Sequence, residues 1–104
     1  MLLLNIDYVP GREIAEALGI VKGTTVQSKN FGRDFMAGMK TLVGGEIVGY
    51  TEMLTEARQI ATKRMADEAE RLGADAVINV RFSSSSIMQG AAEVVAYGTA
   101  VRLA

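Results

Sequence analysis

The side chains that most often carry out chemistry in proteins are missing from this sequence. Its 104 residues include no cysteine and no histidine. Because soft metals are held by thiolate or imidazole, we expect no tight Zn²⁺, Cd²⁺ or iron–sulfur site built from the chain's own side chains. The same absence removes the usual acid–base and thiol groups of enzymes, and the remaining polar side chains show no activating arrangement. We therefore predict no catalytic residues and no bound cofactor.

Two sets of metal donors remain. Met36 and Met39 lie three residues apart in a helical pattern and could share a Cu(I) ion, although packing is the commoner role of methionine. Glu52 and Glu56 lie four residues apart on one helix face, where an oligomer would bring such pairs into rings able to hold a hard cation. A solvated face is the commoner interpretation of such a pair. The candidate metal ligands are therefore Glu52 and Glu56.

Two segments have features of anion sites. The run Ser83–Ser86 is rich in hydroxyls, but it lies where a strand enters a hairpin, so we interpret it as blunting an exposed or subunit-pairing edge. Gly44, Gly45 and Gly49 precede a helix, whose first N–H groups attract anions. These glycines lack the GxGxxG order and the lysine of phosphate loops, so we predict a turn between two helices instead.

One long helix must position most of these residues. From Tyr50 to Leu72 apolar side chains recur at steps of three, four and seven, which predicts an amphipathic helix. Gly73 follows where a left-handed C-terminal cap is wanted. Arg64 and Glu68 interrupt the apolar stripe four residues apart, so they either form an ion pair at its rim, which we favour, or meet another subunit. The predicted buried stripe is Leu54, Ala57, Ala61, Met65 and Leu72.

The remaining segments predict strands and one short helix. Residues 13–28 form either one bent strand or a hairpin, with Gly19 and Gly23 as bulges or turns. A short helix is predicted at residues 35–43. Strands are predicted at residues 2–6, 76–86 and 93–103, the last two joined by a turn at Gln89-Gly90, and Ile78, Val80 and Phe82 are expected on one face. Small residues in the helix stripe and at Ala96, Gly98 and Ala100 predict that the helix lies close over the last strand.

These elements define one α+β domain over residues 1–104, with a β-α-β-β core in which an antiparallel sheet packs on one long helix. N-terminal strands and the short helix are added to this core.

The charge pattern bears on partners and location. The chain has 11 basic and 12 acidic residues, interleaved along the sequence, which argues against nucleic acid or a membrane surface as a partner. The start of the sequence has no basic n-region or cleavage site, and no apolar run is long enough to cross a bilayer, so we expect a cytoplasmic protein. Hydrophobic residues make up 49% of the chain, more than one helix and a small sheet can readily hide, so we expect self-association.

Several sequence segments resemble the YbjQ-like family of small prokaryotic proteins. They are VGGEIVGY, EARQIA, LGADAV and GTAV, together with the earlier marker at residues 30–38, NFGRDFMAG. The resemblance implies a dodecin-like or YbjQ-like fold and assembly into ring-shaped pentamers through added short strands. The family also carries a heavy-metal-binding label, which the missing cysteine and histidine contradict.

The resemblance also suggests where subunits meet. Arg33 and Asp34 adjoin two phenylalanines in the marker, and the pair either joins subunits or is a solvated arginine beside an N-cap aspartate. We expect a cytoplasmic homopentamer that binds a small ligand or metal ion at inter-subunit pockets. The alternatives are a structural or adaptor ring that binds another protein, and a hydrolase that uses carboxylates and a hard cation. The interface or pocket candidates are Phe31, Arg33, Asp34, Phe35, Met36 and Met39.

Overall fold

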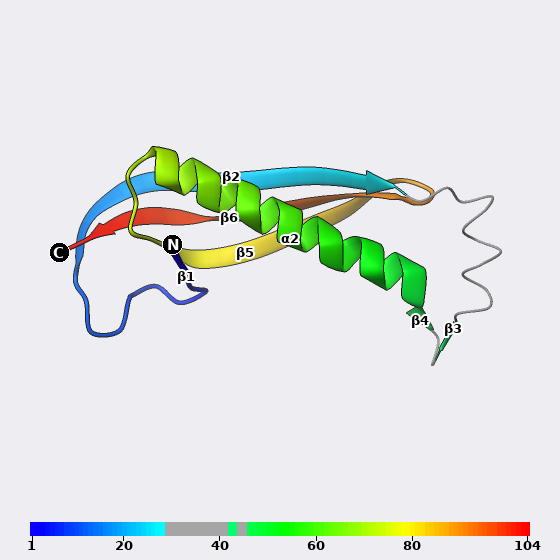
Figure 1. Cartoon of the computed structure of the whole chain (residues 1–104), viewed down its shortest axis with the longest axis horizontal. Helices are drawn as coiled ribbons and strands as arrows, with labels where there is room; N and C mark the ends of the chain where they lie inside the picture. The colour runs from blue at the N-terminus through cyan, green and yellow to red at the C-terminus, as the bar shows by residue number, and fades with distance from the viewer. Residues whose placement is uncertain (29–41, 44–45) are drawn as a thin grey trace.

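One helix packs on a four-stranded sheet in the computed structural model, which describes residues 1–28, 42–43 and 46–104 (Figure 1). The sheet order is β1-β5-β6-β2, and a separate pair is formed by β3 and β4. The elements are β1 (Leu2–Leu3), β2 (Ile14–Ser28), β3 (Leu42–Val43), β4 (Glu46–Ile47), α2 (Val48–Arg71), β5 (Ala76–Met88) and β6 (Ala91–Leu103). The three long strands are antiparallel, whereas β1 adds to β5 in parallel, so the sheet is mixed. The α+β class and the helix-on-sheet core are confirmed.

The long helix follows its predicted apolar spacing closely. Met53, Ala57, Ala61, Met65 and Ala69 recur every four residues and are all buried. After the helix, Gly73 has a φ of +80°, and the amides of residues 73 and 74 donate to the carbonyls of residues 70 and 69 at 2.9 and 3.1 Å. These two bonds form a Schellman cap, as predicted. Leu72 is 45% exposed, so its place in the buried stripe was wrong, because the chain has already left the helix there.

The second strand is a single bent strand of 15 residues. Gly19 has a φ of +114° at a register shift against β6, which confirms it as a bulge position. Gly23 has another role. A Cβ there would overlap the backbone of Ala61 and Met65 and lie 2.8 Å from the Cβ of Arg64. Gly23 therefore lets α2 lie close over β2.

The closest helix contact thus falls on β2 rather than on β6, where it was predicted. Ala57, Ala61, Ala96 and Ala100 do share one buried cluster. Gly98, however, makes room for β5, because a Cβ there would lie 2.7 Å from Cγ1 of Val77 and 2.9 Å from the carbonyl oxygen of Ile78. Small residues on β6 consequently serve two different close approaches.

A bulge divides β5. Its register against β6 shifts between Ile78 and Arg81, and Asn79 has a positive φ of 54°. The amides of Asn79 and Val80 donate to carbonyls in residues 4–6 at 2.9 Å, so the segment after β1 stabilises the bulge. A strand was predicted over residues 2–6, but only the two residues of β1 form one.

The bulge changes which side chains share a face. Ile78 packs in a cluster beneath the N-terminal loop, whereas Val80 packs against the core under α2. Phe82 pairs with Ala96, which belongs to the core under α2, so Phe82 lies on the helix side too. The prediction that Ile78, Val80 and Phe82 share one face was wrong, because the extra residue of the bulge reverses the alternation.

Two turns around these strands were predicted with different success. The hairpin turn at Gln89-Gly90 is confirmed, since Met88 pairs with Ala91 and Gly90 has a φ of +79°. The predicted short helix lies mostly in residues 35–41, outside the described residues. Its last two residues form β3 and pair with β4, so this end of the prediction was wrong. For the same reason, the described part of the link before α2 is a strand pair, and not a turn between two helices.

The molecule is elongated, with extents of 53 × 24 × 17 Å and a radius of gyration of 16.9 Å. A compact chain of this length has a radius of gyration of about 13 Å. Its accessible surface of 6603 Å² also exceeds the roughly 5,700 Å² typical of a monomer of this mass. No helix in the described part of the chain is both long and apolar enough to cross a membrane.

Candidate functional site

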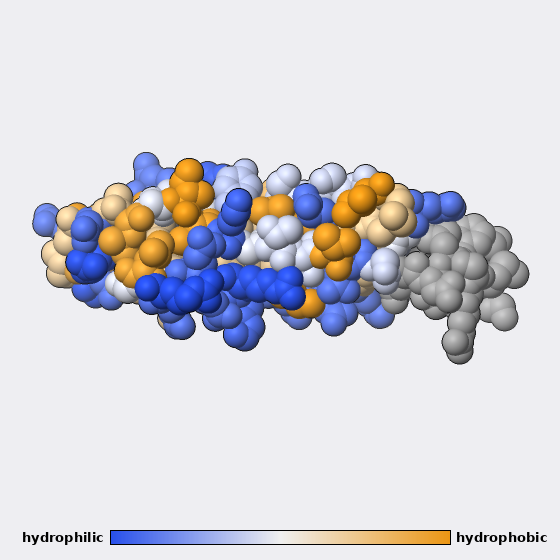
Figure 2. Space-filling view, turned by 90° about the horizontal axis from the view of Figure 1, so that it is seen from above, coloured by the Kyte–Doolittle hydropathy of each residue, from blue (hydrophilic) through white to orange (hydrophobic). Residues whose placement is uncertain are grey.

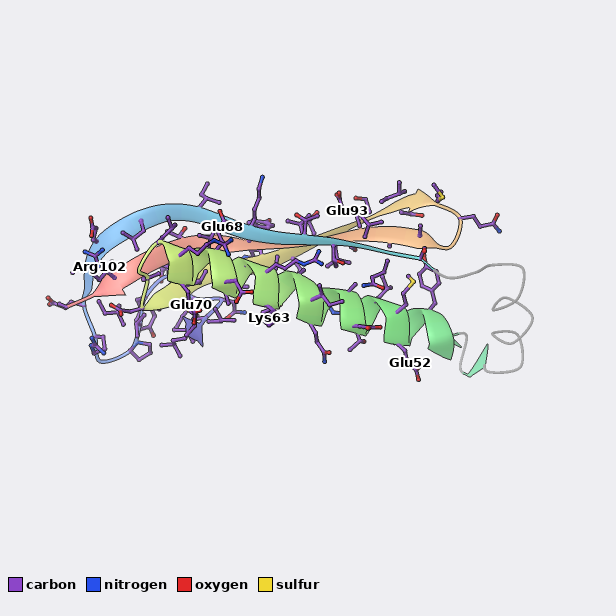
Figure 3. The ribbon with its side chains drawn as sticks, turned by 45° about the horizontal axis from the view of Figure 1, so that its top comes forward. Glu52, Lys63, Glu68, Glu70, Glu93 and Arg102 are labelled. Atoms are coloured by element: carbon purple, nitrogen blue, oxygen red, sulfur yellow. The ribbon has the colours of Figure 1, made fainter. Side chains whose placement is uncertain are left out.

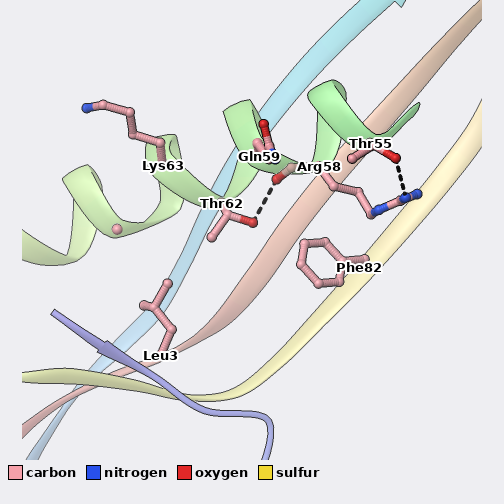
Figure 4. Close-up of a pocket in the computed structure, with 8 residues that line it drawn as sticks. Leu3, Thr55, Arg58, Gln59, Thr62, Lys63 and Phe82 are labelled. Atoms are coloured by element: carbon pink, nitrogen blue, oxygen red, sulfur yellow. Dashed lines mark hydrogen bonds between the residues drawn. The ribbon is translucent and has the colours of Figure 1, made fainter. Parts of the chain in front are cut away.

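A groove runs between α2 and the outer strands β5 and β1. It exists because α2 packs chiefly on β2 and β6 and leaves the helix side of β5 largely uncovered. Its volume is about 470 Å³, within the range of small-molecule sites. Figure 4 shows side chains from α2, β1 and β5 around it. The lining residues are Leu3, Thr55, Arg58, Gln59, Thr62, Lys63, Ala66 and Phe82.

One face of α2 supplies six of these residues. They lie at steps of three and one from residue 55 to residue 66, which places them on the helix face next to the buried stripe. The hydroxyl of Thr62 donates to the carbonyl of Arg58 at 2.7 Å, and Nη2 of Arg58 donates to the hydroxyl of Thr55 at 3.2 Å. Each threonine hydroxyl is therefore engaged in one local hydrogen bond. The walls therefore present mostly methyl and methylene groups to the groove.

The floor of the groove is apolar and comes from the sheet. Phe82 of β5 is 49% exposed, and its ring lies on the strand facing Arg58 (Figure 4). Leu3 of β1 is half-buried beside it along the groove. The ring is on this side only because the β5 bulge turned it there. A large aromatic surface exposed in a concave site is typical of ligand or partner binding.

The two cations at the groove differ in their partners. Lys63 pairs with Asp67 at 3.1 Å, and the two side chains are 78% and 44% exposed. Arg58 has no carboxylate within 4 Å among the described residues, and donates only to the neutral hydroxyl of Thr55. One positive charge is therefore left without a compensating charge beside an apolar floor.

The outer edge of β5 borders the groove. From Arg81 to Met88 all eight residues are exposed, on both faces of the strand. In the described part of the chain β1 is the one strand on this edge, and its pairing covers only Ala76 and Val77. The amide of Val80 points away from β6, since it donates to a carbonyl after β1, and backbone groups alternate along a strand. The N–H and C=O groups with the same outward direction are those of Phe82, Ser84 and Ser86.

The opposite edge of the sheet, at β2, is capped by side chains of α2. The backbone N–H of Lys22 donates to Oε2 of Glu68 at 3.1 Å, and Nη1 of Arg64 donates to the carbonyl of Thr24 at 2.7 Å. Figure 3 shows Glu68 between α2 and β2. The predicted Arg64–Glu68 ion pair was wrong, because both side chains bond to the strand edge instead. These bonds occupy the middle of that edge.

The sheet face turned away from α2 carries exposed apolar side chains. Ile20 is 77% exposed, Val26 57% and Tyr97 40%. The N-terminal loop covers only one end of this face, where Val9 packs on Ala76, Ile78 and Val101. In the view of Figure 2, apolar atoms also reach the surface in two separate groups. This much exposed apolar surface is typical of an interaction surface.

The predicted site residues fall in three places. The interface candidates Phe31, Arg33, Asp34, Phe35, Met36 and Met39 lie outside the described residues. Glu52 and Glu56 are both exposed on α2, and Figure 3 shows Glu52 pointing away from the sheet. Ser83–Ser86 lies on the open edge of β5, in agreement with its interpretation as part of an exposed or subunit-pairing edge. Gly49 lies in the first turn of α2.

The donor set does not fit a heavy metal. The whole chain lacks the thiolates and imidazoles that such metals prefer. Of the described methionines, Met53 and Met65 are buried in the core. Met1, just before β1, and Met88, at the hairpin, are both exposed. Among the residues that the structure describes, no three acidic side chains gather closely enough to hold an ion.

Reasoning from the sequence missed the groove. The signal was available on α2, where Thr55, Thr62 and Ala66 recur on one side at helical spacing. Threonines and an alanine interleaved with Arg58 and Lys63 are also typical of a solvated face. Only the position of Phe82 after the bulge distinguishes the two interpretations.

Comparisons with known proteins agree on the family. A family model described as "Putative heavy-metal-binding" matches residues 1–104. A UPF0145 protein of Clostridium novyi is 61% identical over 103 residues, which cover 99% of each chain. A UPF0145 protein of Thermotoga maritima is 62% identical, over 99% of this chain and 97% of its own.

One solved structure is similar in fold. It is a crystal structure of a protein of unknown function in the DUF74 family, from Pediococcus pentosaceus, with a TM-score of 0.62. The match covers 100% of this chain and 98% of the other, at 17% sequence identity. At that identity the likeness supports the fold alone.

Proposed function

Because the chain belongs to the YbjQ-like family, we propose that it is one subunit of a cytoplasmic homo-oligomeric ring that binds a small ligand in grooves closed at the subunit boundaries. The subunit number of five comes from the family resemblance. The observation that carries the proposal is the half of β5 from Arg81 to Met88, which is exposed on both faces and unpaired along its outer edge within the described chain.

An open strand edge of this kind favours pairing with another chain. The outward N–H and C=O groups of Phe82, Ser84 and Ser86 are a template for an added strand. Monomeric proteins usually block such edges, and this chain does block its other edge, with Arg64 and Glu68. In a closed ring the open edge of every subunit pairs with a neighbour, whereas an open row of subunits would leave an unpaired edge at its end.

The same pairing would complete the groove. Phe82 belongs both to the open edge and to the groove floor. A neighbouring strand added at β5 would therefore lie along the open side of the groove and reduce its contact with water. Assembly and ligand binding are linked through this one strand.

An adaptor ring that binds another protein is the second candidate. The observation that favours it is the exposed apolar face formed by Ile20, Val26 and Tyr97, which lies on the side of the sheet away from the groove. A partner protein seated there would leave the groove open. The carboxylate-dependent hydrolase has no comparable support among the described residues.

The assembly can be tested with a proline that removes one outward N–H. Light scattering of the wild type at micromolar concentration should give about five times the 11.1 kDa chain mass. Ser84→Pro should lower that mass while the subunit keeps its fold, because edge strands tolerate a proline whose N–H would face outward. Ser84→Ala keeps the N–H and should assemble as the wild type does.

Two results would contradict the proposal. A monomeric wild type at this concentration would remove the ring, and with it any pocket closed by a neighbour. An unchanged mass for Ser84→Pro would show that the β5 edge does not take part in assembly.

A further inference from the structure

We propose that the groove between α2 and β5 binds a small amphiphilic monoanion, with a carboxylate at Arg58 and an apolar body over Phe82 and Leu3. The proposal names the ligand class and rests on the proposed function, in which a neighbouring subunit closes the groove. It is carried by the charge, the lining and the shape of the described groove residues.

Arg58 is the group that recognises the anion. Its guanidinium has five N–H donors, of which one nitrogen is engaged, with the neutral hydroxyl of Thr55 at 3.2 Å. No described carboxylate lies within 4 Å of it. A planar guanidinium with free donors matches a carboxylate in a two-point hydrogen bond. Arg58 is exposed in the single subunit, so this bond becomes stronger when a neighbouring subunit closes the groove and reduces its contact with water.

The body of the ligand must be apolar. The exposed ring of Phe82 and the side chain of Leu3 form the floor, and Ala66 with the threonine methyl groups forms the wall. Few polar groups remain for a polar body besides the Gln59 amide, since the hydroxyl hydrogen of Thr62 is donated to the carbonyl of Arg58 and the hydroxyl oxygen of Thr55 accepts from its guanidinium. A sugar or nucleoside would find few partners here for its many polar groups.

The charge at the groove excludes two other ligand classes. A metal cation would be repelled by Arg58, which agrees with the lack of suitable donors in the chain. A polyphosphate would need several uncompensated cations, but the second cation of the groove, Lys63, is already paired with Asp67. A single negative charge on an apolar body fits what remains.

The first test compares two probes with the same ten-carbon body. Calorimetry should detect decanoate, below its micelle concentration, binding at least tenfold more tightly than decanol, because only the carboxylate can form a charged two-point hydrogen bond with Arg58. Arg58→Gln should weaken decanoate about tenfold or more and leave decanol unchanged. Arg71→Gln removes a charge in the last turn of the same helix, away from the groove, and should change neither affinity.

A second variant tests the apolar body. Ala66→Leu adds bulk to the groove wall without changing charge, so it should weaken decanoate and decanol alike. If decanoate and decanol bind equally, or Arg58→Gln has no effect on decanoate, the anion assignment is overturned. If Ala66→Leu changes neither affinity, the site of binding is not this groove.

The light-scattering mass separates this proposal from the previous one. An assembled wild type that does not bind decanoate would overturn the ligand class and leave the ring standing. A monomer that binds decanoate through Arg58 would support the ligand class and overturn the ring.

Discussion

The two outer edges of the sheet differ in how the chain treats them. At the β2 edge, α2 lies directly over Gly23, and Arg64 and Glu68 reach down to bond with the backbone of Thr24 and Lys22. At the β5 edge, the helix stands away, the strand is exposed over its last eight residues, and a groove opens above Phe82.

This difference follows from where small residues lie. Gly23 allows the helix axis to approach β2, and the helix cannot cover β5 equally well at the same time, because one helix is narrower than three strands. The sheet therefore has a closed side that stabilises the subunit and an open side that is available to other molecules. The predictions below test the closed side against the open side.

The largest effect is expected at the close approach of the closed side. Gly23→Val should lower the free energy of unfolding by about 3 kcal/mol or more, because its side chain would overlap the backbone of Ala61 and Met65. Denaturant titration measures this. The control is Gly49→Ala, since a Cβ at Gly49 meets nothing within 4 Å, and its stability should change by less than about 1 kcal/mol. Equal effects at the two glycines would contradict the close approach.

A proline pair on β5 compares inward and outward backbone groups. The amide of Ser85 points toward its partner Glu93 on β6, so Ser85→Pro should cost about 2–3 kcal/mol of stability through the lost ladder bond. Ser84→Pro removes an outward amide and should cost less than about 1 kcal/mol per subunit when measured in the unassembled state. Hydrogen exchange or denaturant titration measures the two losses of stability. If Ser84→Pro costs more than Ser85→Pro, the directions of the backbone groups along this edge are assigned wrongly.

Overpacking under the helix should have a somewhat smaller effect. Ala57 and Ala61 are fully buried, so replacing either by Leu should cost about 1–3 kcal/mol. Thr55→Leu is the control on the open side: Thr55 is exposed at the groove, so the added side chain does not overpack the core. Unchanged denaturant midpoints for both alanine variants would show that the core under α2 can expand.

The sequence predicts the closed side better than the open side. The helix from Val48 to Arg71 and its cap at Gly73 follow from a spacing repeated over six turns and one glycine, which are local signals. The hairpin at Gln89-Gly90 is equally local. These features need no knowledge of distant contacts.

The open side depends on contacts that are distant in sequence. The bulge at Asn79 is stabilised by carbonyls more than 70 residues earlier, and it decides that Phe82 faces the groove. No glycine marks the position, so strict alternation was the natural prediction. Likewise, the spacing of Arg64 and Glu68 suggests a mutual pair, whereas their partners lie on β2, about 40 residues away.

The smallest effect is expected from uncapping the β2 edge. Arg64→Ala and Glu68→Ala each remove one side-chain bond to the strand backbone, so each should lower stability by only about 0.5–1.5 kcal/mol. Lys63→Ala, which removes an exposed pair with Asp67, is the matched control and should cost less.

The double variant, Arg64→Ala with Glu68→Ala, should make the β2 edge resemble the β5 edge. Its backbone groups at Lys22 and Thr24 would then be open to strand addition, and light scattering should show a slow rise in mass above that of the wild-type assembly. This rise should exceed what the lost stability alone produces, because Ala61→Leu, of similar or larger cost, leaves the edge capped. If the double variant keeps the wild-type mass while Ala61→Leu aggregates, the two edges differ in stability and not in their protection from pairing.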